Sequence, residues 1–227
     1  MLPENKLKAV TFSYDDGVSG DIRLVEILNR YKMKCTFNVN TGTQRSSYTW
    51  VNNGVTLRRL DQSEIDEMKL YEGHEVAAHS YTHPHLSDLP DDEIHTELKT
   101  DIDNIEKIYG ERPVGFAYPY GTYNDRLRNI LADYNIRYAR TVNSTHSFAP
   151  QTDLLRFNPT CHHDDEELFN LAKKFIELKT DTPAVFYIWG HSFELDMNKN
   201  WDRFERLCDM LAGKDDIFYG TNKDVLL

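Results

Sequence analysis

The chain has 227 residues, and its 26 Lys and Arg against 37 Asp and Glu give a formal net charge of −11. This length fits one domain, and we expect residues 1–227 to form a single domain. The 40% hydrophobic content, with only 11 Gly and 8 Pro, is typical of a globular protein that buries a sizeable core. The acidic excess repels phosphate backbones and no Lys/Arg stripe offsets it, so we expect no nucleic-acid partner.

No apolar run approaches the ~20 residues that a membrane helix needs, so we expect no membrane partner. The segment Met1–Lys6 lacks the apolar core of a secretory signal. We therefore expect a cytoplasmic location for the chain as it stands, and an extracellular or cell-envelope location if a signal segment precedes it. Three cysteines without a C-x-x-C pair disfavour both a disulfide framework and a thiolate zinc site. Any metal must then be held by His and carboxylate, and the oligomeric state is left open.

Short β-rich runs alternate with longer segments of helical period, which indicates parallel strands joined by crossover helices. The predicted strands are Lys8–Ser13, Cys35–Asn40, Glu75–His79, Val114–Tyr118, Arg137–Val142, Leu154–Asn158, Ala184–Trp189 and Ile217–Gly220. The predicted helices are Ile22–Tyr31, Ser63–Tyr71, Asp91–Tyr109, Asp125–Tyr134, Asp165–Lys179 and Asn200–Leu211. The fold class is therefore α/β, and eight strands suit a barrel.

The helix at Asp91–Tyr109 has the clearest pattern, because apolar residues recur every three or four positions between Pro90 and Gly110. Asn124 is a good N-cap for the helix that follows it. The stretch Gln44–Leu60 has neither period and is predicted to be a long loop or an insertion. In a barrel of parallel strands the functional groups gather at the C-terminal ends of the strands, so candidate residues are sought there.

Two adjacent acids, Asp15 and Asp16, follow the first predicted strand directly, and Gly17 lets the chain turn sharply after them. Because successive side chains diverge, one carboxylate can bind a cation while its neighbour faces the substrate. An Asp-Gly sequence is also common in ordinary turns, and taken alone that interpretation is the stronger one.

His79 and His83 lie four positions apart where the third predicted strand ends, so they can converge on one tetrahedral ion. A pair of surface histidines shows the same pattern. Their position at a strand end, in a chain whose first strand ends in two acids, favours the metal. His191 follows the seventh predicted strand and is either a structural residue or, beside an activated water, a general acid with a pKa near neutrality.

These motifs, in this order, resemble the polysaccharide deacetylase family, also called carbohydrate esterase family 4, with its chitooligosaccharide deacetylase homology domain. The family's first motif, T-F-D-D-G, matches as Ser13–Gly17, and its second, H-[S/T]-x-x-H-P-x-L, matches in full as His79–Leu86. The third, R-x-P-Y-G, matches only in Pro119–Gly121, because Ala117 stands where the family has Arg. The fifth, a hydrophobic residue two before a His, matches as Trp189–His191, and the fourth, with its Asp-Trp pair, is not found.

The resemblance implies a distorted (β/α) barrel of seven or eight mostly parallel strands. It also implies one divalent metal ion, most often zinc, which Asp16, His79 and His83 would hold together with bound water. The reaction that it implies is hydrolysis of the N-acetyl groups of an amino sugar polymer or oligomer, chitin- or peptidoglycan-like.

In that scheme Asp15 is the general base, the backbone amide of Tyr120 stabilises the oxyanion, and His191 protonates the leaving amine. A carbohydrate is thus the expected partner. Its expected contacts are Pro119, Tyr120, Trp189 and His162.

The missing third-motif Arg leaves Asp15 without the cation that helps to orient the base in the family. Arg140, near the end of the fifth predicted strand, is the candidate replacement, because a guanidinium can clamp a carboxylate through two hydrogen bonds. An arginine at a barrel end, paired to any nearby acid, is an equally good interpretation. The run Cys161–Asp165 looks like a second metal cluster, but its acids are better explained as the start of the next helix, whose positive end favours them.

Two alternatives to the deacetylase remain. The first is a C–N hydrolase of a small amide or ureide on the same scaffold. The second is a catalytically inactive carbohydrate-binding relative, against which the presence of Asp15 and His191 argues. Acetate release from an N-acetylglucosamine oligomer separates all three.

Overall fold

The protein, seen here in a computed structural model that describes residues 2–227, is built on one sheet of eight strands. Its main path has the order β7-β6-β5-β2-β1-β9-β8, and β10 pairs with β1. These strands are β1 (Lys8–Asp15), β2 (Cys35–Val39), β5 (Glu75–Ala78), β6 (Gly115–Ala117), β7 (Tyr138–Arg140), β8 (Cys161–His162), β9 (Ala184–Gly190) and β10 (Ile217–Tyr219). All their pairings are parallel.

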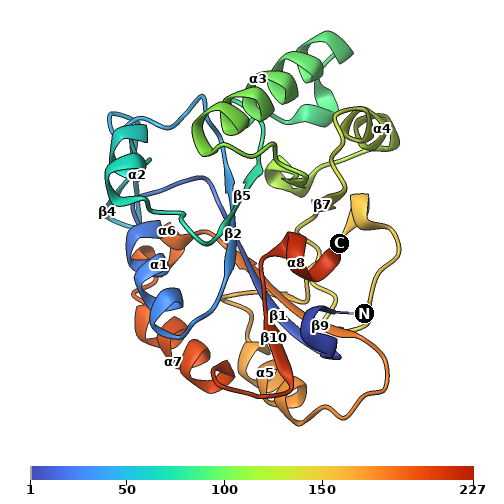
Figure 1. Ribbon diagram of the computed structural model, residues 1–227. Coiled ribbons are helices and arrows are strands. Elements are labelled where there is room, and N and C mark those ends of the chain that lie inside the picture. The colour runs from blue at the N-terminus through green and yellow to red at the C-terminus, as the bar shows by residue number, and fades with distance from the viewer. Residues whose placement is uncertain (1) are drawn as a thin grey trace.

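Helices connect the strands and surround the sheet (Figure 1). They are α1 (Asp21–Arg30), α2 (Gln62–Met68), α3 (Asp91–Tyr109), α4 (Asp125–Asp133), α5 (Leu168–Glu177), α6 (Ser192–Met197), α7 (Trp201–Leu211) and α8 (Asn222–Leu226). Every residue of β1, β2 and β9 is buried, as expected for parallel strands covered on both faces. Within the described residues, none of these helices combines the length and the apolar character needed to span a membrane.

The longest helix, α3, follows from its sequence pattern. Its inward face is formed by Ile94, Leu98, Ile102 and Ile105. Acids occupy the first turn, where the positive end of the helix dipole favours them, and Gly110 ends the helix with a φ of 78°. The predicted bounds of this helix are confirmed at both ends.

Most of the other predicted elements are also present. Seven of the eight predicted strands and all six predicted helices occur within a few residues of their expected bounds. Asn124 caps α4 by accepting a hydrogen bond from the Leu127 amide at 2.8 Å. The mostly parallel, curled sheet confirms the prediction of a distorted α/β barrel.

The strand predicted at Leu154–Asn158 is wrong. Leu154–Arg156 forms a 3-10 turn, and only Phe157 makes a single bridge to the end of β7. The strand that pairs with β9 is instead β8, whose two residues are too few to show an alternating pattern.

Three further features depart from the sequence analysis. The stretch Gln44–Leu60 contains an antiparallel hairpin of β3 (Thr49–Asn52) and β4 (Val55–Arg58). Helix α5 begins three residues later than predicted, so the acids after His163 precede the helix rather than open it. The sequence did not predict α6 and α8, because helices of six and five residues are too short to show a helical period.

The sheet curls so strongly that its distant strands meet. β7 lies four strands from β1, which would be about 19 Å in a flat sheet. Nevertheless the Arg140 guanidinium of β7 contacts the Asp15 carboxylate of β1. On the open side, the Phe157 amide donates to β7 and the Thr160 amide donates to β9, so the intervening segment links the two halves of the sheet. The C-terminal strand ends therefore surround a common interior.

Shortening a buried side chain of α3 tests this account of packing. Ile102→Ala should lower the free energy of unfolding by about 2–5 kcal/mol, because it removes core contacts and leaves a cavity. Lys107→Ala, on the exposed face of the same helix, should change it by no more than about 0.5 kcal/mol. Denaturant titration measures both, and equal effects would contradict the assigned core face.

Candidate active site

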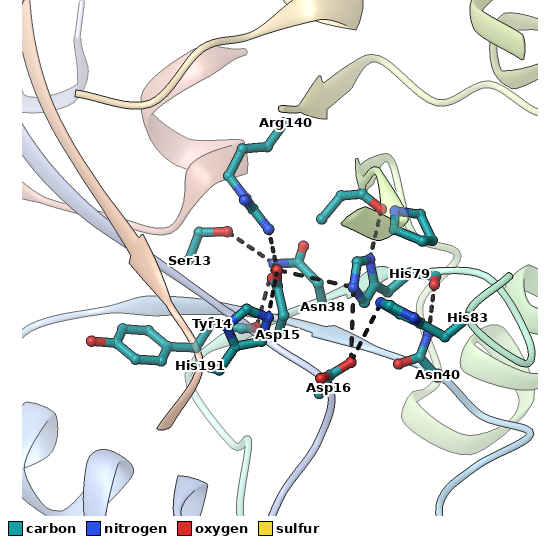
Figure 2. Close-up of polar contacts among 12 residues, drawn as sticks. Ser13, Tyr14, Asp15, Asp16, Asn38, Asn40, His79, His83, Arg140 and His191 are labelled. Atoms are coloured by element: carbon teal, nitrogen blue, oxygen red, sulfur yellow. Dashed lines mark hydrogen bonds and ion pairs between the residues drawn. The ribbon is translucent and has the colours of Figure 1, made fainter. Parts of the chain in front are cut away.

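Asp15 and Asp16 lie at the C-terminal end of β1. Asp15 is the last residue of the strand and is only 3% exposed, and Asp16 follows it with a φ of 85°, a strained backbone conformation for a residue other than glycine. The Asp16 amide donates to the Asn38 carbonyl of β2 at 2.9 Å, which holds the chain where it turns. In Figure 2 the Asp15 carboxylate faces Arg140 and the Asp16 carboxylate faces His83, while His79 lies 3.9 Å from both.

Asp16, His79 and His83 converge on one point. From Asp16 Oδ1, His79 Nε2 lies 3.9 Å away and His83 Nε2 lies 3.8 Å away. His79 Nδ1 donates a hydrogen bond to the Ala117 carbonyl at 2.7 Å, which leaves the Nε2 lone pair free on the side of Asp16 (Figure 2). His83 has a φ of 64°, a second strained position in this group. The structure thus brings together the three residues predicted as metal ligands.

The protonation states of these three groups suit a divalent cation. Burial lowers the pKa of His79 against the opposing effect of the nearby acids, and it lowers the pKa of His83 to about 4. Burial alone would raise the pKa of Asp16, but Arg59 and the nearby imidazoles outweigh burial and hold that pKa below its usual range. Among the described residues, none donates a well-aligned hydrogen bond to the buried Asp16 Oδ1. A carboxylate oxygen and two neutral imidazole nitrogens therefore fit a zinc-like ion.

Asp15 is held by partners on several sides. Arg140 Nη2 pairs with its Oδ2, and Asn38 Nδ2 donates to its Oδ1 at 2.8 Å. His79 Nε2 and His191 Nε2 each lie 3.9 Å from Oδ2. Burial would raise the pKa of Asp15, but the Arg140 charge, with the two imidazoles, lowers it below the usual value. Asp15 is therefore an oriented, ionised carboxylate.

Arg140 reaches Asp15 directly, so the predicted contact is confirmed. In the sheet register Arg140 lies beside Ala117, the position at which the third motif of the resemblance has its Arg. The guanidinium therefore enters at the same level of the barrel, from the neighbouring strand. Its Cζ lies 4.5 Å from the centre of the Trp189 ring, and the residue is only 1% exposed. The catalytic role of Arg140 stays a prediction.

His191 lies between Asp15 and a carboxylate that the sequence did not single out. Its Nδ1 lies 3.3 Å from Glu194 Oε2, and the same oxygen accepts a hydrogen bond from the His191 amide at 3.0 Å. Burial would lower the pKa of His191, but Glu194, Asp16 and Asp15 outweigh it and raise the pKa to about 9. His191 is therefore an imidazolium at neutral pH, held by the first turn of α6.

His162, predicted as a substrate contact, directs its ring toward Glu194. His162 Nε2 lies 3.0 Å from Glu194 Oε2, and His163 Nε2 lies 3.4 Å from the same oxygen. Because His162 Nδ1 accepts a hydrogen bond from the Asp164 amide at 3.1 Å, the proton of the neutral ring is on Nε2. His162 thus faces Glu194 as a donor, without the free lone pair that a second metal ion would need.

The other predicted substrate residues differ in exposure. Tyr120 is 54% exposed, and its ring stacks on His85 with centroids 3.8 Å apart. Pro119 is buried, and Trp189 is only 9% exposed beneath the Arg140 guanidinium. Of this set Tyr120 has the surface on which a sugar could stack, and the substrate roles of all four residues stay predictions.

Four residues around the site were not singled out from the sequence: Asn38, Arg59, Asp101 and Glu194. Glu194 does leave a sequence signal, because a glutamate three positions after the residue that precedes a helix can reach back to it. Asp101 is a buried residue of α3 that accepts a hydrogen bond from the His79 amide at 3.2 Å. The sequence pattern did not indicate it, because only the apolar residues of this helix were used to predict its buried face. Arg59 belongs to the segment in which no period was found.

The fold and these groups together define the class of the protein. It is an α/β-barrel protein with an aspartate, two histidines and a buried Asp–Arg pair at the C-terminal ends of its strands. The family model described as polysaccharide deacetylase matches residues 3–139. The chain belongs to the polysaccharide deacetylase family, which confirms the resemblance of its motifs.

Relatives with assigned names match part of the chain. Chitin deacetylase 1 of Cryptococcus neoformans var. grubii is 31% identical over 125 residues, which are 55% of this chain and 23% of that protein. The peptidoglycan-N-acetylmuramic acid deacetylase PdaC of Bacillus subtilis is 34% identical over 129 residues, 57% of this chain and 24% of that protein. The chain thus spans about a quarter of the length of these relatives.

A solved structure shows the same fold over the whole chain. A Mycobacterium smegmatis protein assigned to the polysaccharide deacetylases aligns with a TM-score of 0.72 at 17% identity. The alignment covers 100% of this chain and 91% of that one.

The two adjacent acids should differ in their effect on metal binding. Asp16→Asn should lose most of its zinc, because the amide removes the charge that faces both imidazoles. Asp15→Asn should retain stoichiometric zinc and lower kcat by about 10²-fold, because an amide cannot accept a proton. Metal analysis after dialysis measures the zinc content of both variants, and activity is assayed in parallel. Zinc loss confined to Asp15→Asn would mean that Asp15 is the metal ligand and Asp16 the proton acceptor.

Proposed function

We propose that the chain is a metal-dependent hydrolase that removes N-acetyl groups from an amino sugar polymer or oligomer, chitin- or peptidoglycan-like. One zinc ion held by Asp16, His79 and His83 would be its cofactor. The observation that carries the proposal is the position of this triad beside the Asp15 carboxylate and the His191 imidazole. The two named deacetylases of chitin and of peptidoglycan support the substrate class.

Asp15 would act as the general base. When bound, the ion would lower the pKa of water and polarise the acetyl carbonyl. Asp15 is ionised and has one oxygen fixed by Asn38 and the other by Arg140, so it is set to accept the proton of the attacking water. The cation that orients it also lowers its basicity, so positioning rather than a raised pKa is the contribution of this residue.

His191 would act as the general acid. Its Nε2 proton would pass to the amide nitrogen as the C–N bond breaks, while the Tyr120 amide would stabilise the developing oxyanion. Glu194 favours the protonated ring before transfer. Asp15 gains one proton and His191 loses one, and their 3.9 Å separation allows the proton to return through one bridging water. The two residues then regain their starting states.

Acetate release tests the function. The zinc-loaded protein is incubated with N-acetylglucosamine oligomers and with peptidoglycan fragments, and acetate is measured with and without a chelator. Chelator-sensitive acetate release, about 10²-fold slower in Asp15→Asn, is the expected result. Hydrolysis restricted to small amides or ureides would favour the first alternative, and oligomer binding without acetate would favour the second.

Removing the Arg140 charge should affect turnover more than binding. Arg140→Ala should lower kcat by about 10²-fold with a smaller rise in KM, because Asp15 loses the partner that orients it. Arg140→Lys should recover part of kcat, since it restores the charge without the planar fork. Steady-state kinetics on an acetylated oligomer measures both, and a rise in KM at constant kcat would assign Arg140 to substrate binding.

Removing the Glu194 charge should change the pH dependence. His191 is active as the imidazolium, so kcat/KM should fall as the pH rises through the His191 pKa of about 9. A bound cation would offset the charge of Asp16 and would therefore lower this pKa. Glu194→Gln should move this alkaline limb down by about one pH unit, because Asp15 and Asp16 then remain as the nearby acids. Asp196→Asn removes a charge from the same helix at Trp201 and should leave the limb in place. Coincident profiles for Glu194→Gln and the unaltered protein would exclude this role.

A further inference from the structure

Arg59 is a buried cation beside the predicted metal ligands. It follows β4 of the hairpin, is 6% exposed, and places Nη1 3.0 Å from Asp16 Oδ1. Nη1 also donates to the Asp16 carbonyl and lies 3.4 Å from Asn40 Oδ1. Asp16 is the carboxylate that pairs with Arg59 in the described structure.

The backbone fixes Arg59 relative to Asp16. The Ser19 amide donates to the Arg58 carbonyl at 3.0 Å, and the Leu60 amide donates to the Gly17 carbonyl at 2.9 Å. These bonds join the base of the hairpin to the segment that immediately follows Asp16. The hairpin and the turn of β1 therefore hold guanidinium and carboxylate together.

Two aromatic rings of the hairpin region lie near the guanidinium. Arg59 Cζ lies 5.6 Å from the Tyr48 ring and 5.9 Å from the Trp50 ring. Rings at this distance attract a cation and reduce its contact with water, so its field on nearby groups is weakly screened. Its polar contacts are instead concentrated at Nη1, which faces Asp16 and Asn40.

The oxygen that Arg59 contacts is the one that faces both imidazoles. Asp16 Oδ1 lies 3.0 Å from Nη1 of Arg59 and 3.8 Å from Nε2 of His83. A cation held between this oxygen and the two imidazoles would share it with the guanidinium, and two cations on one carboxylate oxygen repel each other.

We propose that Arg59 sets the metal affinity of this site: it neutralises Asp16 in the metal-free protein and weakens metal binding by charge repulsion. The inference rests on the proposed metal triad. An arginine that only oriented Asp16 would have the opposite effect, because loss of an orienting partner lowers metal affinity.

Zinc titration against a competing chromogenic chelator tests the proposal without any substrate. Arg59→Gln and Arg59→Met remove the charge, and both should bind zinc about tenfold more tightly than the unaltered protein. Arg59→Lys keeps the charge and should stay within about threefold of it. Arg58→Gln is the matched control, because Arg58 of the same hairpin pairs with Glu64 and should leave the affinity unchanged.

The outcomes separate this proposal from the proposed function. Zinc affinity that is unchanged or weaker in folded Arg59→Gln, with zinc still bound by the unaltered protein, overturns the role of Arg59 alone. Absence of zinc binding in every variant overturns the metal triad and with it both proposals. Should both neutral variants unfold, the Arg59 Nε–H signal of the ¹⁵N-labelled unaltered protein gives the result. Movement of this signal on zinc saturation toward the position of a solvent-exposed arginine, as the guanidinium leaves Asp16, supports the proposal. A signal that keeps its ion-paired position, as that of an orienting arginine would, overturns it.

Discussion

The ion pair between Asp15 and Arg140 is the contact on which the arrangement of the site depends. Both side chains are almost completely buried, and a buried charge without its partner is costly, so each residue stabilises the other at its position. The two lie four strands apart, and the pair forms only because the sheet curls back on itself. That curl also turns the ends of β5 and β9, with His79 and His191, toward the same acids. The closure of the sheet therefore determines the geometry of the site.

The exchange of an arginine between neighbouring strands follows from the sheet register. Ala117 and Arg140 are register partners on β6 and β7, so a side chain from either strand starts at the same height in the barrel. With alanine at 117, space is left for the guanidinium to cross from β7, and the Ala117 carbonyl still fixes the tautomer of His79. A guanidinium attached to β7 rather than to β6 therefore reaches Asp15 from the same height in the barrel.

Sequence reasoning succeeded where a pattern repeats and failed where one residue depends on a distant partner. The repeat of apolar residues in α3 and the motifs that hold Asp15 and His79 at strand ends are each contained in a short stretch of sequence. The helix and the two strands were therefore predicted. Phe157 lies in an apolar run, yet the run forms only one bridge to Arg140, because the chain then leaves β7 and its next paired residues, Cys161 and His162, lie beside β9. Arg59 is positioned by backbone hydrogen bonds between the hairpin and the turn after β1. The residues next to Arg59 in the sequence do not indicate these bonds.

The charges of the site form three pairs, Asp15 with Arg140, Asp16 with Arg59, and Glu194 with His191. Each pair is neutral by itself, and His79 and His83 add no charge, because burial keeps them unprotonated. The charges of these eight side chains therefore balance, and a divalent ion held among them would leave an excess of positive charge within this group. Such an excess favours reactions in which negative charge develops on the substrate, as it does on the oxygen of an amide under attack by water.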